Sequence, residues 1–213
     1  DDLKLEDFKG RNCWVSIDRS LVNDITSICL LFDDEDGGCT CFYINLLPRH
    51  AITCATDHLK EVYLKAEAAG NLEVVEGKLI RNHQLVKYFM WINEHFDVQM
   101  YGYDPYKMTE TAMHLEEKGF LMVSVSQGVG NMSEPSKKLE ELIIGEIFRY
   151  NDNLFEFSCE NAIQGVTKMN NVAIYRDNVQ TEKIDPLIAT IIALSCATLQ
   201  KIDGNIYDTR DLL

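Results

Sequence analysis

Three aspartates stand where their carboxylates could bind divalent metal ions. Asp18 ends a short apolar run, residues 13–17, and Asp104 ends a second one, residues 98–103. Asp185 opens the longest apolar helical stretch in the chain. Carboxylates delivered at the ends of separate elements can converge beyond the edge of a sheet, and hard divalent cations prefer oxygen ligands. The pattern predicts a metal site made by these three side chains.

Acids that bridge and flank two metal ions about 3.5–4 Å apart support phosphodiester hydrolysis. In this interpretation Asp18 bridges the ions from a rigid central strand, Asp104 flanks from the neighbouring strand, and Asp185 reaches in from a helix packed across the sheet. Proline follows both Asp104 and Asp185, so each also suits a plain turn or helix cap. Only their joint placement favours a metal site. Asp24 is a fourth candidate ligand, although its position in a tight turn favours a turn-shaping role.

Other catalytic motifs are missing from the sequence. Cys39 and Cys41 have no second cysteine pair and no paired histidines to complete a zinc site, so the seven cysteines are interpreted as reduced thiols. Residues 70–79 resemble a P-loop only superficially, because Leu79 replaces the Ser or Thr that would hold magnesium. The acidic and glycine-rich residues 33–38 predict a solvated hairpin loop rather than a calcium site.

Composition limits the class of protein. The 213 residues suit one domain, and 20 basic against 34 acidic residues give a formal charge of -14. That sign disfavours a freestanding nucleic-acid binder, so DNA contact needs a local basic patch or a tethered partner. The polar start predicts no signal peptide, and its lack of Met indicates a piece of a longer protein. Residues 187–199 are too short to span a bilayer, so no membrane partner is expected.

Hydrophobic periodicity and turn residues predict an α/β protein. Strands are predicted over 13–18, 25–32, 39–47, 97–103, 120–125, 154–158 and 171–175. Helices are predicted over 55–69, from a cap at Asn82, over 107–118, over 133–147 and over 185–201. An antiparallel meander followed by parallel strands separated by helices is the order of a ribonuclease-H-like mixed sheet flanked by helices. Residues 1–213 are expected to form one such domain.

Several segments, in order along nearly the whole chain, resemble the nuclease domain of tailed-phage large terminase subunits. They are residues 5–11, 16–20, 23–28, 103–106, 119–120, 127–128, 133–142 and 182–194. The chain departs from the family pattern at Arg19, where Leu is more frequent, and at Pro186, where Gly is common. Residues 149–153 also lack the His-Gly-Gly that often follows the preceding helix.

The resemblance implies a metal-dependent DNA endonuclease that cuts concatemeric viral DNA at the initiation and completion of packaging. Asp18, Asp104 and Asp185 carry over as the metal-binding acids, with two Mg²⁺ or Mn²⁺ ions as cofactors. The implied partners are double-stranded DNA, an upstream packaging ATPase domain of the same protein, the portal and the small terminase subunit. The implied location is the cytoplasm of the bacterial host cell.

Four basic residues near the third acid in sequence are candidate phosphate contacts, although solvated surface charge explains each of them equally well. They are Lys183, Arg176, Lys168 and Arg149. Two other functions stay open. A resolvase- or transposase-like enzyme would yield joined strands rather than cuts. A non-catalytic docking module of the packaging motor would bind no Mn²⁺ and leave DNA intact.

Overall fold

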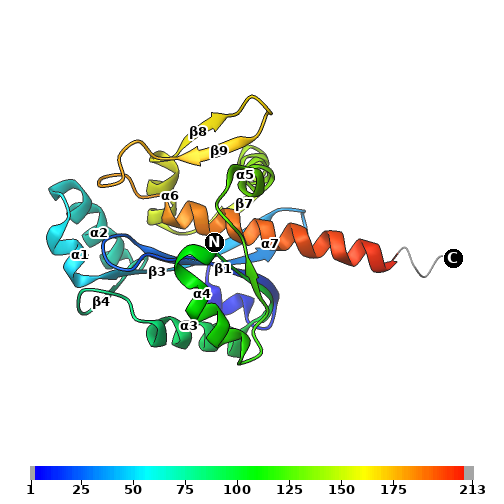
Figure 1. The fold of residues 1–213 in the computed structure, drawn as a ribbon, viewed down its shortest axis with the longest axis horizontal. Coiled ribbons are helices and arrows are strands. Elements are labelled where there is room, and N and C mark those ends of the chain that lie inside the picture. Colours follow the sequence, from blue (N-terminus) through cyan, green and yellow to red (C-terminus); the bar gives the residue numbers. More distant parts are fainter. Residues whose placement is uncertain (1–2, 209–213) are drawn as a thin grey trace.

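The computed structural model describes the backbone of residues 3–208 and the side chains of residues 3–200. A seven-stranded mixed sheet forms its centre, with helices on both faces (Figure 1). The strands are β1 (Asn12–Asp18), β2 (Thr26–Asp33), β3 (Cys39–Pro48), β4 (Glu73–Val75), β5 (Asp97–Tyr103), β6 (Met122–Ser124) and β7 (Phe148–Tyr150). A separate hairpin pairs β8 (Ile163–Val166) with β9 (Val172–Tyr175).

Strand β1 lies in the middle of the sheet, whose order is β4-β3-β2-β1-β5-β6. It runs antiparallel to β2 and parallel to β5, and β2 and β3 continue the antiparallel meander. Strands β4 and β7 both pair in parallel with β3, at its opposite ends. The predicted ribonuclease-H-like arrangement, an antiparallel meander followed by parallel strands, is confirmed.

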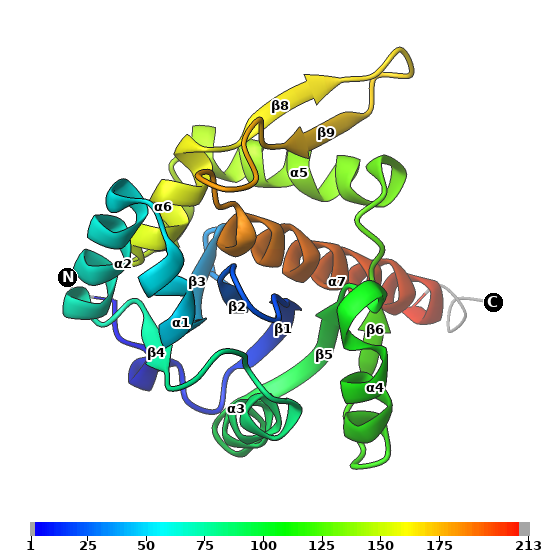
Figure 2. The same ribbon diagram turned by 60° about the vertical axis from the view of Figure 1, so that its left-hand side comes forward.

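The helices form layers on the two faces of the sheet. They are α1 (Arg49–Cys54), α2 (Asp57–Ala69), α3 (Asn82–His95), α4 (Pro105–Glu116), α5 (Val129–Ile144), α6 (Asn153–Glu160) and α7 (Asp185–Asp208), after a 3₁₀ turn at Leu5–Phe8. Helices α3 and α4 cover one face, and α7 runs across the other (Figure 1). Helix α5 packs on the outer side of α7, and the β8–β9 hairpin lies against α5 (Figure 2).

Apolar side chains fill the space between the sheet and each helix layer. Beneath α3, the rings of Phe8 and Phe96 pack on Phe32, with centroids 4.9 and 5.6 Å away. On the other face, Leu31 and Ile188 belong to the core between the sheet and α7. Alternation along the strands sends successive side chains to opposite faces, so the central strands are buried on both.

Helix α7 approaches the sheet closely, because small and polar residues face it. A β-carbon at Gly102 would lie 2.7 Å from Ile192 Cγ2 and from Cys196 Sγ, so only glycine permits this contact. Ser16 Oγ donates a hydrogen bond to the Ala189 carbonyl at 2.5 Å. These contacts fix the helix that begins at Asp185 relative to β1 and β5.

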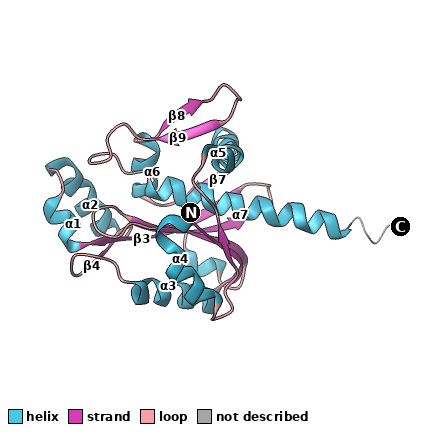
Figure 3. Ribbon diagram, in the orientation of Figure 1, coloured by secondary structure: helices cyan, strands magenta, loops and turns pink. Residues whose placement is uncertain are grey.

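The prediction of a strand over 154–158 is wrong, since these residues lie in α6 (Figure 3). Asp152 caps that helix: its Oδ1 accepts a hydrogen bond from the Phe155 amide at 2.8 Å. The alternating apolar residues resemble a strand, but the cap decides for a helix. The N-cap of α3 is Arg81 and not Asn82 as predicted, because Asn82 is already the first helical residue. The short elements α1, β4, β7 and β8 were not predicted.

The seven cysteines are all free thiols, and five of them are buried, which agrees with their interpretation as core residues. Within residues 3–208, no helix is long and apolar enough to cross a membrane.

Candidate metal centre

Asp18 and Asp104 end neighbouring strands at the same edge of the sheet. Ile17 of β1 pairs with Tyr103 of β5 in parallel register. The residues that follow them, Asp18 and Asp104, therefore lie at the same edge of the sheet. Asp104 is the N-cap of α4 and accepts a hydrogen bond from the Tyr106 amide at 3.0 Å. The predicted placement at strand ends is therefore confirmed for both acids, and Asp104 also fills the alternative role of a cap.

The Asp18 carboxyl is partly buried and lies among charges. Gln127 Nε2 donates a hydrogen bond to its Oδ1 at 3.2 Å. Burial raises the pKa of Asp18 to about 6; the positive charge of Lys107 opposes this shift, and the carboxylate of Asp104 adds to it. A carboxyl with this environment gains from any cation that comes close to it.

Asp185 is the first residue of α7 and is almost fully buried, with 7% of its surface exposed. Its Oδ2 has no hydrogen-bond partner among the described residues. Burial raises its pKa well above the ordinary value, and the negative charges of Asp18 and Asp24 raise it further. A buried carboxylate oxygen without a partner is costly, and a hard divalent cation is the partner such an oxygen prefers. The carboxylates of Asp185 and Asp18 are therefore suited to bind a metal ion.

The three acids influence one another without forming a closed cage. The charge of Asp104 raises the pKa of Asp18, and the charge of Asp18 raises the pKa of Asp185, so all three carboxyls lie near the end of β1. Across the described residues, no three His, Cys, Asp or Glu side chains are grouped closely enough to hold an ion as they stand. The side chains of this centre would have to close around an ion on binding.

Asp24 is a charge partner for two cations beside these acids. Lys183 Nζ donates to its Oδ1, and Arg176 Nη2 lies 3.4 Å from its Oδ2. Lys183 is nearly buried and also donates to the Val179 carbonyl at 2.9 Å, while Arg176 Nη1 donates to the Glu182 carbonyl at 2.9 Å. Asp24 thus anchors the segment that leads from the β8–β9 hairpin into α7.

With this geometry in view, comparison with known proteins gives a clear assignment. The family model described as terminase large subunit, endonuclease domain, matches residues 3–201. The chain belongs to this family. It is 26% identical over 217 residues to Protein YmfN of Escherichia coli strain K12, covering 97% of this chain and 48% of that protein. The chain therefore spans about half the length of this curated relative.

Solved terminase structures share the fold of this nuclease domain. The crystal structure of the HK97 bacteriophage large terminase superposes with a TM-score of 0.78 at 19% identity, covering 89% of this chain and 40% of that one. The large terminase nuclease from the thermophilic phage G20c gives a TM-score of 0.55 at 10% identity, covering 86% and 81% of the two chains.

The four basic residues that sequence proximity suggested as phosphate contacts lie in three different places of this terminase nuclease domain. Arg176 and Lys183 are beside the acids but are engaged with Asp24. Lys168 is exposed at the turn of the β8–β9 hairpin. Arg149 lies at the far end of the sheet, because β7 pairs with the start of β3 whereas Asp18 is aligned with its end. A role in DNA contact stays a prediction for all four.

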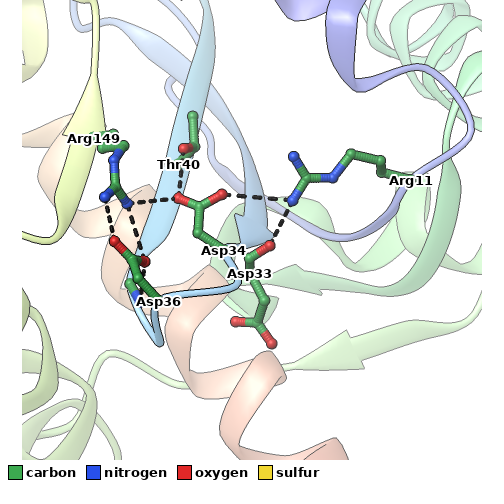
Figure 4. A network of polar contacts seen from close by, with 7 residues as sticks. Arg11, Asp33, Asp34, Asp36, Thr40 and Arg149 are labelled. Atoms are coloured by element: carbon green, nitrogen blue, oxygen red, sulfur yellow. Dashed lines mark hydrogen bonds and ion pairs between the residues drawn. The ribbon is translucent and has the colours of Figure 1, made fainter.

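Arg149 belongs to a network at that far end (Figure 4). It pairs with Asp34 at 3.0 Å and with Asp36, and Arg11 Nη2 lies 3.5 Å from the other Asp34 oxygen. Thr40 donates to Asp34 at 2.8 Å. The acidic run forms the predicted loop between β2 and β3, and its negative charge is partly balanced by two arginines.

Sequence reasoning missed the residues that surround Asp18. Lys107 supplies positive charge from the first turn of α4, and Gln127 supplies the hydrogen bond. Arg19, which follows Asp18, is buried between α3 and α4. These residues are separated from their partners by 63 to 109 positions in the sequence, and no short-range pattern connects them.

Proposed function

We propose that this terminase nuclease domain is a divalent-metal-dependent DNA endonuclease, with Asp18, Asp104 and Asp185 as its metal ligands. The observation that carries the proposal is the buried, unpartnered Oδ2 of Asp185 at the place where Asp18 is also desolvated. Two buried carboxyls that repel each other are expensive unless they share a cation or a proton. Membership of an endonuclease-domain family makes the cation the better interpretation.

Mg²⁺ and Mn²⁺ suit these oxygen ligands, and a pair of such ions would activate water and neutralise charge that develops on a phosphodiester. Asp18 holds its place through the central strand, and Gln127 orients its Oδ1. Asp185 reaches the site from α7. Lys107 adds a positive charge beside Asp18, where it would attract the phosphate backbone.

The biological substrate that we propose is concatemeric double-stranded viral DNA, cut during genome packaging in the cytoplasm of the bacterial host. The basis is the family, whose description names the large terminase subunit. Since the chain covers about half of its curated relative, we propose that a packaging ATPase domain precedes it in the whole protein. The portal and the small terminase subunit are the further partners that this role requires.

The test is cleavage of supercoiled plasmid by the 213-residue chain in the presence of Mn²⁺ or Mg²⁺. The wild type is expected to nick and linearise the plasmid with little sequence preference. Asp18→Asn and Asp185→Asn should reduce cutting to background, because each removes a charged ligand while keeping the side-chain volume. Asp57→Asn is the matched control, since Asp57 is fully exposed on α2.

Equal cutting by Asp18→Asn and wild type would overturn the assignment of the site. A wild type that neither cuts DNA nor gives heat with Mn²⁺ in calorimetry would instead favour the docking module, for which the charge of -14 is suitable. Joined strands among the products would favour the strand-transfer enzyme.

A further inference from the structure

Arg19 links the strand that carries Asp18 to both helices on one face of the sheet. It follows Asp18 directly, and only 7% of its surface is exposed. Its Nη1 donates to the Lys107 carbonyl and to Thr111 Oγ1, both at 3.1 Å, in α4. Its Nη2 donates to Asn82 Oδ1 at 2.6 Å, in the first turn of α3. One guanidinium therefore joins β1, α3 and α4 at the edge where the acids lie.

Stability alone does not explain a buried arginine at this position. Its hydrogen-bond partners are neutral, and the negative charge of Glu110 favours its charged form without forming an ion pair with it in the described part of the chain. Its Nε is buried without a hydrogen-bond partner among the same residues. Burying a cation with incomplete hydrogen bonding is costly, and an apolar side chain of similar size often serves stability as well or better.

The contacts of Arg19 determine how β1 and α4 meet. The first turn of α4 holds two groups of the proposed site, the N-cap Asp104 and the cation Lys107. Arg19 is bonded to the carbonyl of Lys107 itself and lies next to Asp18 in the chain. A planar guanidinium with several fixed donors can hold such partners at set angles, which a lysine cannot do.

We propose that Arg19 is a positioning residue that holds Asp104 and Lys107 at the distance from Asp18 that metal binding requires. This inference rests on the proposed function and deepens it. Arg19 is not a ligand, since its guanidinium is engaged with α3 and α4. It acts through the carboxylates, so its loss changes metal affinity while leaving the fold in place.

The test compares the Mn²⁺ affinity and thermal stability of the wild type with those of Arg19→Met. Calorimetry is expected to show an affinity for Mn²⁺ that is lower by about 10-fold or more, in the range seen when groups that orient metal ligands are removed. The melting temperature is expected to stay the same or to rise. A purely structural role would give the reverse, with a lower melting temperature and unchanged affinity of the folded protein.

Four further variants make the result specific. Arg19→Lys keeps the charge but cannot bridge the two helices, so it should restore little of the affinity. Thr111→Val and Asn82→Ala each remove one partner, and both should weaken Mn²⁺ binding less than Arg19→Met does; they also serve if Arg19→Met does not fold. Arg11→Met, at the far end of the sheet, is the arginine control and should bind Mn²⁺ as the wild type does.

If Arg19→Met, Thr111→Val and Asn82→Ala all bind Mn²⁺ with wild-type affinity, the positioning role is overturned while the proposed function stays intact. Full restoration by Arg19→Lys would also overturn it, because charge alone would then be sufficient. A wild type that binds no Mn²⁺ and cuts no DNA would overturn the proposed function, and this inference with it.

Discussion

At the scale of single residues, the edge of the sheet around Asp18 brings together more negative than positive charge. Four carboxyls, those of Asp18, Asp24, Asp104 and Asp185, stand against the cations Lys107, Arg176 and Lys183. Asp24 is ion-paired with two of these cations, whereas burial desolvates Asp18 and Asp185, and the charge of Asp18 raises the pKa of Asp185. This imbalance is the physical reason to expect a divalent cation there.

Another buried carboxyl, that of Asp152, gives a prediction about stability and pH. It caps α6 and accepts a hydrogen bond from Asn45 Nδ2 at 2.9 Å, and burial raises its pKa to about 7. The folded state therefore keeps a proton that the unfolded chain releases near pH 4. The contribution of Asp152 to the free energy of unfolding is fully present below about pH 4 and is lost as the pH rises through 7. Between these values the slope from this group is up to about 1.4 kcal/mol per pH unit.

Asp152→Asn should remove this share of the pH dependence. Urea unfolding between pH 5 and 7.5 is expected to show that the wild type loses about 2 kcal/mol more than the variant. The exposed Asp57→Asn should keep the wild-type slope. Parallel curves for wild type and Asp152→Asn would contradict the shifted pKa.

The positions of Asp18, Asp104 and Asp185 at the ends of elements could be predicted from sequence, because each acid follows or begins a strong apolar segment. Their surroundings could not. Whether Asp24 is a ligand or a charge partner depends on Arg176 and Lys183, more than 150 residues further along the chain. Only the packing of the β9–α7 segment against the turn after β1 brings these side chains together.

At the scale of elements, α7 is the part that delivers Asp185. It lies between the sheet and α5, and its contacts with β1, β2 and β5 fix its position. Tyr43 Oη and Thr190 Oγ1 are hydrogen-bonded at 2.8 Å, which adds a contact with β3. A shift of this helix would move Asp185 relative to Asp18.

Gly102→Ala tests this dependence. The added methyl group would meet Ile192 and Cys196 at 2.7 Å, so α7 must move away from β5. We expect a loss of roughly 1–3 kcal/mol in unfolding free energy, as for other overpacked cores, together with slower DNA cutting by the protein that is folded. Gly130→Ala, in α5, meets nothing within 4 Å and should be neutral or slightly stabilising, with normal cutting. Normal cutting by Gly102→Ala would show that the place of α7 is not critical.

The order of the long elements could be predicted from sequence, because their apolar periods are clear and turn residues separate them. The exceptions are short. The strand β7 has three residues and gains its hydrogen bonds only from β3, more than 100 positions earlier. In α6 the local alternation was overridden by the Asp152 cap and by burial of Leu154 and Phe155 against neighbouring elements.

At the scale of the whole molecule, the charge of -14 opposes contact with DNA. The positive groups at the site are few, and two of them are engaged with Asp24. The isolated chain is therefore expected to bind DNA weakly and to lose cutting activity as salt concentration rises. We therefore expect this domain to need another part of the whole protein to hold the DNA that we propose as its substrate.

Fusion of a sequence-independent double-stranded-DNA-binding domain to the N-terminus tests this dependence. The tether raises the local concentration of DNA, so half-maximal plasmid cutting should need roughly 100-fold less protein. The same fusion carrying Asp18→Asn should remain inactive. Equal activity of fused and unfused chains would mean that the domain holds DNA well without help.

The central claim is that Asp18, Asp104 and Asp185 together bind divalent metal. Anomalous diffraction from a crystal soaked in Mn²⁺ tests it most directly. We predict one or two Mn²⁺ peaks within coordination distance of these three carboxylates, with Asp185 Oδ2 as a ligand. A crystal without Mn²⁺ at these residues, or with Mn²⁺ bound only elsewhere, would contradict the account.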